Sequence, residues 1–72
     1  MTYMTLNQSK MVVKLDEVVS AFPTKEGLDY RIGIIFAKTQ GIHVNYNADQ
    51  ERRDADYQLI ITKLKQLTGG GL

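Results

Sequence analysis

The chain has 72 residues, of which 43% are hydrophobic and 24% are charged, so it has room for one domain with one core and lacks the composition of a disordered chain. Its net charge of +1 supplies no long-range field that would attract nucleic acid or an anionic membrane. It has no cysteine, no apolar run near the length of a membrane span and no signal-like start, so we expect a cytoplasmic location without disulfides.

Two short strands are predicted at the beginning of the chain. Residues 2–6 alternate in polarity, with Met4 and Leu6 on one side. Residues 7–10 form a polar turn, and strand character resumes over residues 11–15. The pattern is typical of a short strand, a turn and a second strand.

The segment 15–22 fits two structures. The β-branched pair Val18 and Val19 favours a strand, whereas Asp16 as a cap and a shared helical face favour a helix. We expect a strand. The next residues, 23–27, begin with proline and end with glycine, which predicts a polar connecting loop.

The clearest strand covers residues 30–38, where strict alternation places Ile32 and Ile34 on one apolar face. A turn follows, and Gly41 is expected to supply the positive φ of a three-residue hairpin with a bulge. Residues 42–46 return with apolar side chains opposite that face. This hairpin is the predicted nucleus of the fold.

A helix is predicted from about Ala48 to about Leu67, with Asn47 as N-cap and Gln50 three residues later. Gly69 is a plausible C-terminal cap. Side chains on one stripe at about 100° per residue should pack on the sheet. They are Tyr57, Ile60, Ile61, Leu64 and Leu67.

Together these elements predict an α+β fold, in which a small antiparallel β-meander of four to five short strands packs against one C-terminal helix. Residues 1–68 form a single domain, and residues 69–72 form a flexible glycine-rich tail. The outline resembles that of small bacterial and phage accessory proteins, although no motif points to a particular family.

One helix covers only one face of a sheet, yet the predicted strands carry apolar residues on both faces. On the helix, Leu59 points nearly opposite the core stripe and begins a weakly apolar seam. A non-enzymatic interaction or assembly module, self-associating and of unknown pathway, is therefore predicted. Its candidate interface residues are Val12, Val19, Ile35, Ala37, Ala55, Leu59 and Thr62.

Catalytic and metal-binding patterns are missing from the sequence. A single histidine, His43, has no partner at metal-ligand spacing, so we expect no metal, no cofactor and no enzymatic activity. The carboxylates Asp49, Glu51, Asp54 and Asp56 alternate with arginines early in the predicted helix, which indicates a solvated helix face.

The alternative function is a small nucleic-acid-binding regulator that uses the sheet face. Aromatic side chains on strands can stack on bases while nearby cations meet phosphates. The candidate cationic residues are Lys14, Arg31, Lys38 and His43.

Overall fold

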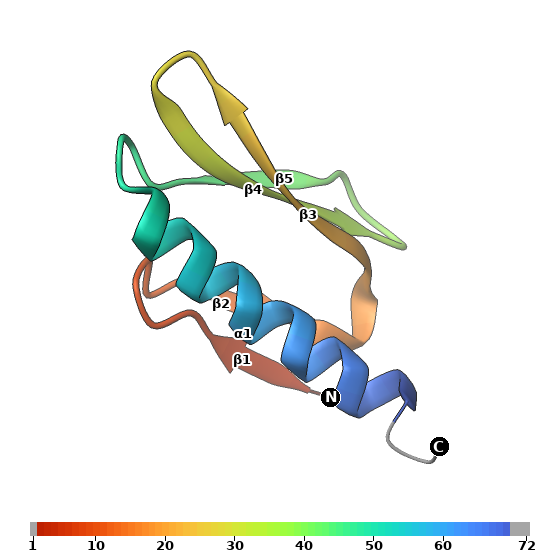
Figure 1. Cartoon of the computed structure of the whole chain (residues 1–72). Helices are drawn as coiled ribbons and strands as arrows, with labels where there is room; N and C mark the ends of the chain where they lie inside the picture. Colours follow the sequence, from red (N-terminus) through yellow and green to blue (C-terminus); the bar gives the residue numbers. More distant parts are fainter. Residues whose placement is uncertain (1, 70–72) are drawn as a thin grey trace.

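Two antiparallel sheets and one C-terminal helix make up the computed structural model, which describes residues 2–69 (Figure 1). The predicted α+β class is confirmed, but the strands divide between a two-stranded sheet β1–β2 and a three-stranded meander β3–β4–β5. In chain order the elements are β1 (Tyr3–Thr5), β2 (Val12–Lys14), the 3-10 helix η1 (Leu15–Glu17), β3 (Val18–Glu26), β4 (Asp29–Phe36), β5 (Ile42–Asn45) and α1 (Gln50–Gly69).

The β1–β2 hairpin buries the side predicted from its alternation. Met4 pairs with Val13, and both side chains are buried together with Leu6 and Leu15. The connecting turn ends at Lys10, which has a left-handed φ of 64°. Four of the buried apolar side chains therefore come from this hairpin and the residues that flank it.

The ambiguous segment 15–22 contains a short 3-10 turn, Leu15–Glu17, followed by strand β3. The expected strand is confirmed from Val18 onward. A register shift lies between Val18 and Ser20, which marks a bulge at the start of β3.

The loop predicted over residues 23–27 is wrong, because β3 continues through Pro23 to Glu26 and pairs with β4. The chain reverses instead at Gly27 and Leu28. Of these two, only Gly27 has a positive φ, of 61°, which is the pattern of a type II′ hairpin turn.

Pro23 is tolerated in β3 because β3 is an edge strand. The backbone N–H and C=O of Tyr30 bond to Asn47 and Tyr46 on the β5 side, so by alternation Arg31 bonds to Thr24 on the β3 side. The neighbouring Pro23 then directs its nitrogen toward the open edge, where a missing N–H breaks no ladder bond.

In the β4–β5 hairpin the apolar residues of β5 lie opposite the apolar face of β4, as predicted, with Ile32 opposite Val44 and Ile34 opposite Ile42. The prediction that Gly41 takes a positive φ is wrong, since among the described glycines only Gly27 does. Gly41 is instead required by crowding: a Cβ there would lie 2.9 Å from the carbonyl oxygen of Ile34. The loop covers residues 37–41, so it is longer than the predicted three-residue turn.

Helix α1 begins later than predicted, because Asn47 has a left-handed φ of 55° and is not the N-cap. The cap is Asp49, whose Oδ1 accepts a hydrogen bond of 3.1 Å from the backbone N–H of Arg52. At the other end, Gly69 belongs to the helix, and the rest of the predicted tail, residues 70–72, lies outside the described residues. No helix within residues 2–69 is long and apolar enough to cross a membrane.

The predicted apolar stripe of α1 is right only in its middle. Ile60 is fully buried, and Tyr57 and Leu64 pack partly against the core. Leu67, by contrast, is 47% exposed, since it lies near the end of α1. Two polar residues on the inward side, Arg53 and Asp56, are buried instead.

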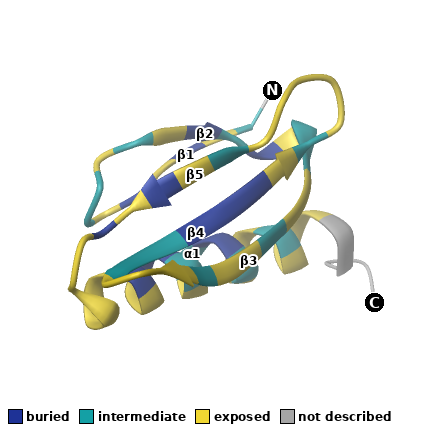
Figure 2. Cartoon of the chain, turned by 90° about the horizontal axis from the view of Figure 1, so that it is seen from above, coloured by how far each residue is buried: buried dark blue, intermediate teal, exposed yellow. Residues whose placement is uncertain are grey.

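The core lies on one side of the β3–β5 sheet. In Figure 1 both α1 and the β1–β2 hairpin lie below this sheet, and side chains from all three units meet there. Figure 2 views the sheet from the opposite side, where no described element covers it. The buried apolar side chains are Met4, Leu6, Val13, Leu15, Ile32, Ile34, Val44, Tyr46 and Ile60.

Candidate functional site

The uncovered side of the β3–β5 sheet is the candidate interaction surface. Because Ile32 and Ile34 face the core, the residues that alternate with them face away from it. Strand pairing then places one cross-strand row, Phe22, Gly33 and His43, in the middle of this surface. We define the outer face by its residues Ser20, Phe22, Thr24, Arg31, Gly33, Ile35, His43 and Asn45.

The centre of the outer face is aromatic and apolar. A Cβ on Gly33 would lie 2.4 Å from Cζ of Phe22, so the phenyl ring occupies the space above that glycine. Gly33 is buried as a result, whereas Phe22 is 39% and Ile35 is 45% exposed. Sequence reasoning missed Phe22, although it lies two residues after Ser20 and therefore on the same side of β3.

Charge on the outer face is compensated at one end. Nη1 of Arg31 lies 2.9 Å from Oε2 of Glu26, and Nη2 lies 3.9 Å from Oδ2 of Asp29. The row of Phe22, Gly33 and His43 carries no lysine, arginine or carboxylate.

The predicted interface residues do not form one surface. Val12 is 61% exposed but lies on β2 of the other sheet, while Val19 is 64% exposed in the bulge at the start of β3. Ala37 is exposed after β4. The remaining candidates, Ala55, Leu59 and Thr62, lie on α1.

On α1, the predicted orientation of Leu59 away from the core is wrong. Leu59 is partly buried and packs against the core, because α1 contacts both the β3–β5 sheet and the β1–β2 hairpin. Ala55 and Thr62 are exposed. Without Leu59, the proposed helix seam lacks its only large apolar side chain.

The predicted cationic residues are likewise dispersed. Lys14 lies on β2, where its Nζ is 2.7 Å from Oε2 of Glu17, and this hydrogen bond raises the pKa of Lys14. Lys38 is exposed in the loop after β4. Only Arg31 and His43 share the outer face.

The prediction that Asp56 lies on a solvated helix face is wrong, because this side chain is fully buried. Its carboxylate accepts hydrogen bonds from the backbone N–H groups of Gln8 at 3.0 Å and Ser9 at 3.1 Å. The hydroxyl of Tyr46 donates a third bond of 2.6 Å. Burial and this bond to Asp56 raise the pKa of Tyr46.

Two arginines of α1 also join elements that are distant in sequence. Arg52 donates to the backbone oxygen of Gln8 at 2.8 Å. Arg53, only 7% exposed, donates to the carbonyl oxygen of Thr24 at 2.9 Å, and its guanidinium carbon lies 5.2 Å from the Tyr30 ring centroid. These polar groups hold the hairpins onto the helix.

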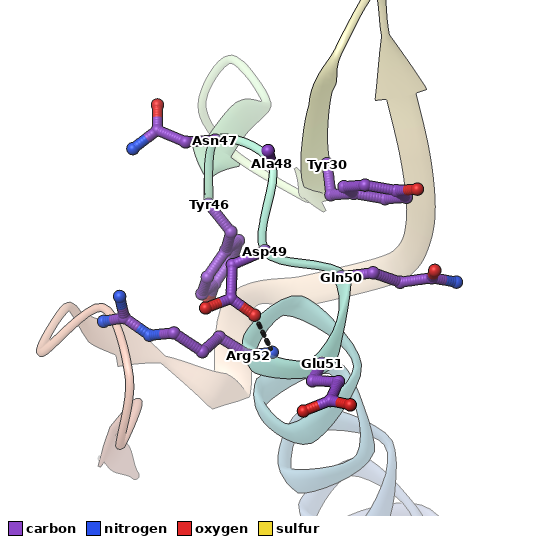
Figure 3. Close-up of a pocket in the computed structure, with 8 residues that line it drawn as sticks. All are labelled: Tyr30, Tyr46, Asn47, Ala48, Asp49, Gln50, Glu51 and Arg52. Atoms are coloured by element: carbon purple, nitrogen blue, oxygen red, sulfur yellow. Dashed lines mark hydrogen bonds between the residues drawn. The ribbon is translucent and has the colours of Figure 1, made fainter.

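An open hollow of about 630 Å³ lies at the beginning of α1, between the side chains of Tyr30 and Tyr46 (Figure 3). The carboxylate of Asp49 already caps the helix there, and Glu51 adds a second acidic group. These carboxylates oppose the binding of an anion at the helix N-terminus. Within residues 2–69, no group of three or more His, Cys, Asp or Glu side chains is arranged to hold a metal ion.

Comparison with protein-family models, with curated proteins and with solved structures finds no match to the chain.

Proposed function

We propose that the chain is a non-enzymatic assembly module, which binds protein through the outer face and associates with itself. The observation that carries the proposal is the exposed pair Phe22 and Ile35, which flank the side-chain-free position Gly33 on an uncovered sheet. Their exposure leaves apolar surface in water at the centre of this face.

An apolar centre on the solvent side is unusual for an antiparallel sheet that packs on one side. Such sheets commonly place polar residues outward, whereas aromatic side chains are enriched where proteins meet. Polar residues, among them Ser20, Thr24 and Asn45, surround the centre of the outer face. An apolar centre with a polar rim is the usual anatomy of a protein interface.

Binding of nucleic acid has weaker support. Phosphate contacts require available cations, but Arg31 is paired with Glu26 and Asp29, and Lys14 is paired with Glu17. The central row of the outer face holds aromatic and small side chains without a lysine or arginine among them. A protein partner matches this surface better than a phosphate backbone does.

The test compares three variants. Phe22→Thr and Ile35→Thr remove apolar surface while keeping a residue that favours strands, and Val12→Thr is the matched control on β2. We expect the first two to weaken self-association, measured as molar mass by light scattering in a dilution series, and to reduce capture of proteins from an extract of the source cells.

Val12→Thr should change neither readout. The proposal fails if the parent is monomeric at every concentration and if the captured proteins are the same for parent and variants. Binding of the parent to a labelled single-stranded oligonucleotide at low salt, weakened by Arg31→Ala and Lys38→Ala, would favour the nucleic-acid alternative.

A further inference from the structure

We infer that the occupant of the outer face is a second copy of this chain, packed face to face about a two-fold axis near the row of Phe22, Gly33 and His43. The inference rests on the proposed function and specifies its partner and contact geometry. Three features of the outer face support it: its charge, the open edge of β3 and the relief of its central row.

Charge is the first feature. In a two-fold contact, residues near the axis meet their own copies, so a charged residue there would face a like charge. The central row has no lysine, arginine or carboxylate, and Arg31, nearer the rim, is paired with Glu26 and Asp29. The exposed side of α1 differs, because it bears several charged side chains, among them Glu51, Lys63 and Lys65.

The open edge of β3 is the second feature. A partner strand added to an edge needs a row of free N–H and C=O groups, but Pro23 removes a donor from the middle of this edge. Lys25, two residues after Pro23, adds a charge to the same strand. Pairing of a second copy along the β3 edge is thereby disfavoured, which favours contact through the face of the sheet over contact through this edge.

The third feature is relief. Because Gly33 has no side chain, the Phe22 ring lies over it, and β4 projects no side chain of its own there between Arg31 and Ile35. Two such faces can approach to the roughly 10 Å spacing of packed sheets. Three strands of about five residues present on the order of 240 Å² in projection, well below the roughly 800 Å² per partner of a stable complex. The dimer should therefore be weak and reversible.

The experiment uses single cysteines, since the parent sequence contains none. His43→Cys and Ser20→Cys place a thiol on the outer face, while Thr5→Cys and Thr62→Cys place one on β1 and on α1. Two sheets packed about 10 Å apart place facing Cα atoms beyond the roughly 7 Å reach of a disulfide, so the thiols are joined with a short bismaleimide instead. Each variant is treated with this reagent at several protein concentrations, up to several hundred micromolar, and resolved on a denaturing gel.

We expect dimer bands from His43→Cys, from Ser20→Cys or from both, at a yield at least fivefold above that of Thr5→Cys and Thr62→Cys. Adding Phe22→Thr to His43→Cys should lower the yield at least twofold. Equal cross-linking of all four variants, or preferential cross-linking of Thr62→Cys, would overturn the inference.

Failure of the inference and failure of the proposed function give different results. If the pure chain stays monomeric and uncross-linked while protein capture still depends on Phe22 and Ile35, the partner is another protein and the second copy is excluded. If neither cross-linking nor residue-dependent capture occurs, the outer face does not bind protein and both proposals fall.

Discussion

The hydroxyl oxygen of Tyr46 lies 2.6 Å from Oδ2 of Asp56, and both residues are buried. The same carboxylate binds two backbone N–H groups of the turn between β1 and β2. One side chain of α1 thus connects the end of β5 with the β1–β2 hairpin, although the two sheets share no strand pairing. The position of the hairpin depends on this carboxylate as well as on apolar packing.

Replacing Asp56 with asparagine should lower the free energy of unfolding by about 1–3 kcal/mol. The amide N–H₂ group would face other donors, so at least one buried N–H or O–H group would lose its partner. Tyr46→Phe should cost about 1.5–3 kcal/mol, because it deletes a hydrogen bond to a charged group. Urea unfolding measures both values.

The two changes should not be additive, since each removes the same bond. In the double variant we expect a coupling of at least about 0.5 kcal/mol in a double-mutant cycle. Asp16→Asn, at an exposed carboxylate of η1, serves as the control and should stay within about 0.5 kcal/mol of the parent. Strict additivity would contradict a shared hydrogen bond.

The raised pKa of Tyr46 predicts that stability falls at alkaline pH. Below the ordinary tyrosine value of about 10, the phenol is protonated in both states and the stabilisation is complete. Above it, the unfolded chain binds fewer protons than the folded one, so this group lowers stability by about 1.4 kcal/mol per pH unit until the folded pKa is reached.

The measurement is the free energy of unfolding of the parent and of Tyr46→Phe between pH 9 and pH 11. Other groups titrate in the same range, among them Lys14, whose pKa the Glu17 hydrogen bond raises, and for this reason the difference between the two proteins is the readout. We expect that difference to shrink as the pH rises above about 10. A constant difference would mean that Tyr46 titrates alike in both states.

Strict alternation and helical periodicity predicted the elements that depend on local pattern. The apolar face of β4 and the middle of α1 follow from the periods of two residues in a strand and 3.6 residues in a helix. These periods place the same side chains on one face whatever element packs against it. The continuation of β3 through Pro23 could not be predicted locally. It depends on which side of the strand is an edge, and only the order of strands in the sheet determines that.

The candidate surface was predictable in part. Ile35 was expected on an uncovered face, whereas Asp56 was assigned to solvent because acidic residues early in a helix usually interact with its dipole. A signal was present: Asp56 precedes Ile60 by four residues and therefore lies on the same helical stripe. What periodicity could not reveal is that the turn after β1 offers backbone donors at that point.

Arg53 should resist conservative substitution. A lysine ammonium cannot donate to the carbonyl oxygen of Thr24 and stack its plane on the Tyr30 ring at once, as the guanidinium does. Arg53→Lys should therefore cost about 1–3 kcal/mol and accelerate hydrogen exchange of the β3–β4 amides more than that of β1–β2. Lys65→Arg, a substitution at an exposed position of the same helix, should change neither the stability nor the hydrogen exchange of the β3–β4 amides. Uniform acceleration in both hairpins would show that Arg53 does not act locally.

Two glycine substitutions should separate folding from association. In Gly41→Ala the new Cβ meets the backbone oxygen of Ile34 at 2.9 Å, and because neither group can rotate away we expect a loss of about 1–3 kcal/mol of stability. In Gly33→Ala the Cβ meets the far end of the Phe22 side chain, which is 39% exposed and free to turn outward.

Gly33→Ala should therefore stay within about 0.5 kcal/mol of the parent in stability. Its effect should appear in self-association, because a displaced ring and an added methyl group change the shape of the centre of the outer face. We expect the dissociation constant to rise roughly tenfold, equivalent to about 1.4 kcal/mol. Light scattering across a dilution series measures it, with thermal unfolding as the check on folding. An unchanged association curve would mean that the Phe22 and Gly33 packing lies outside the contact, even if the dimer itself exists.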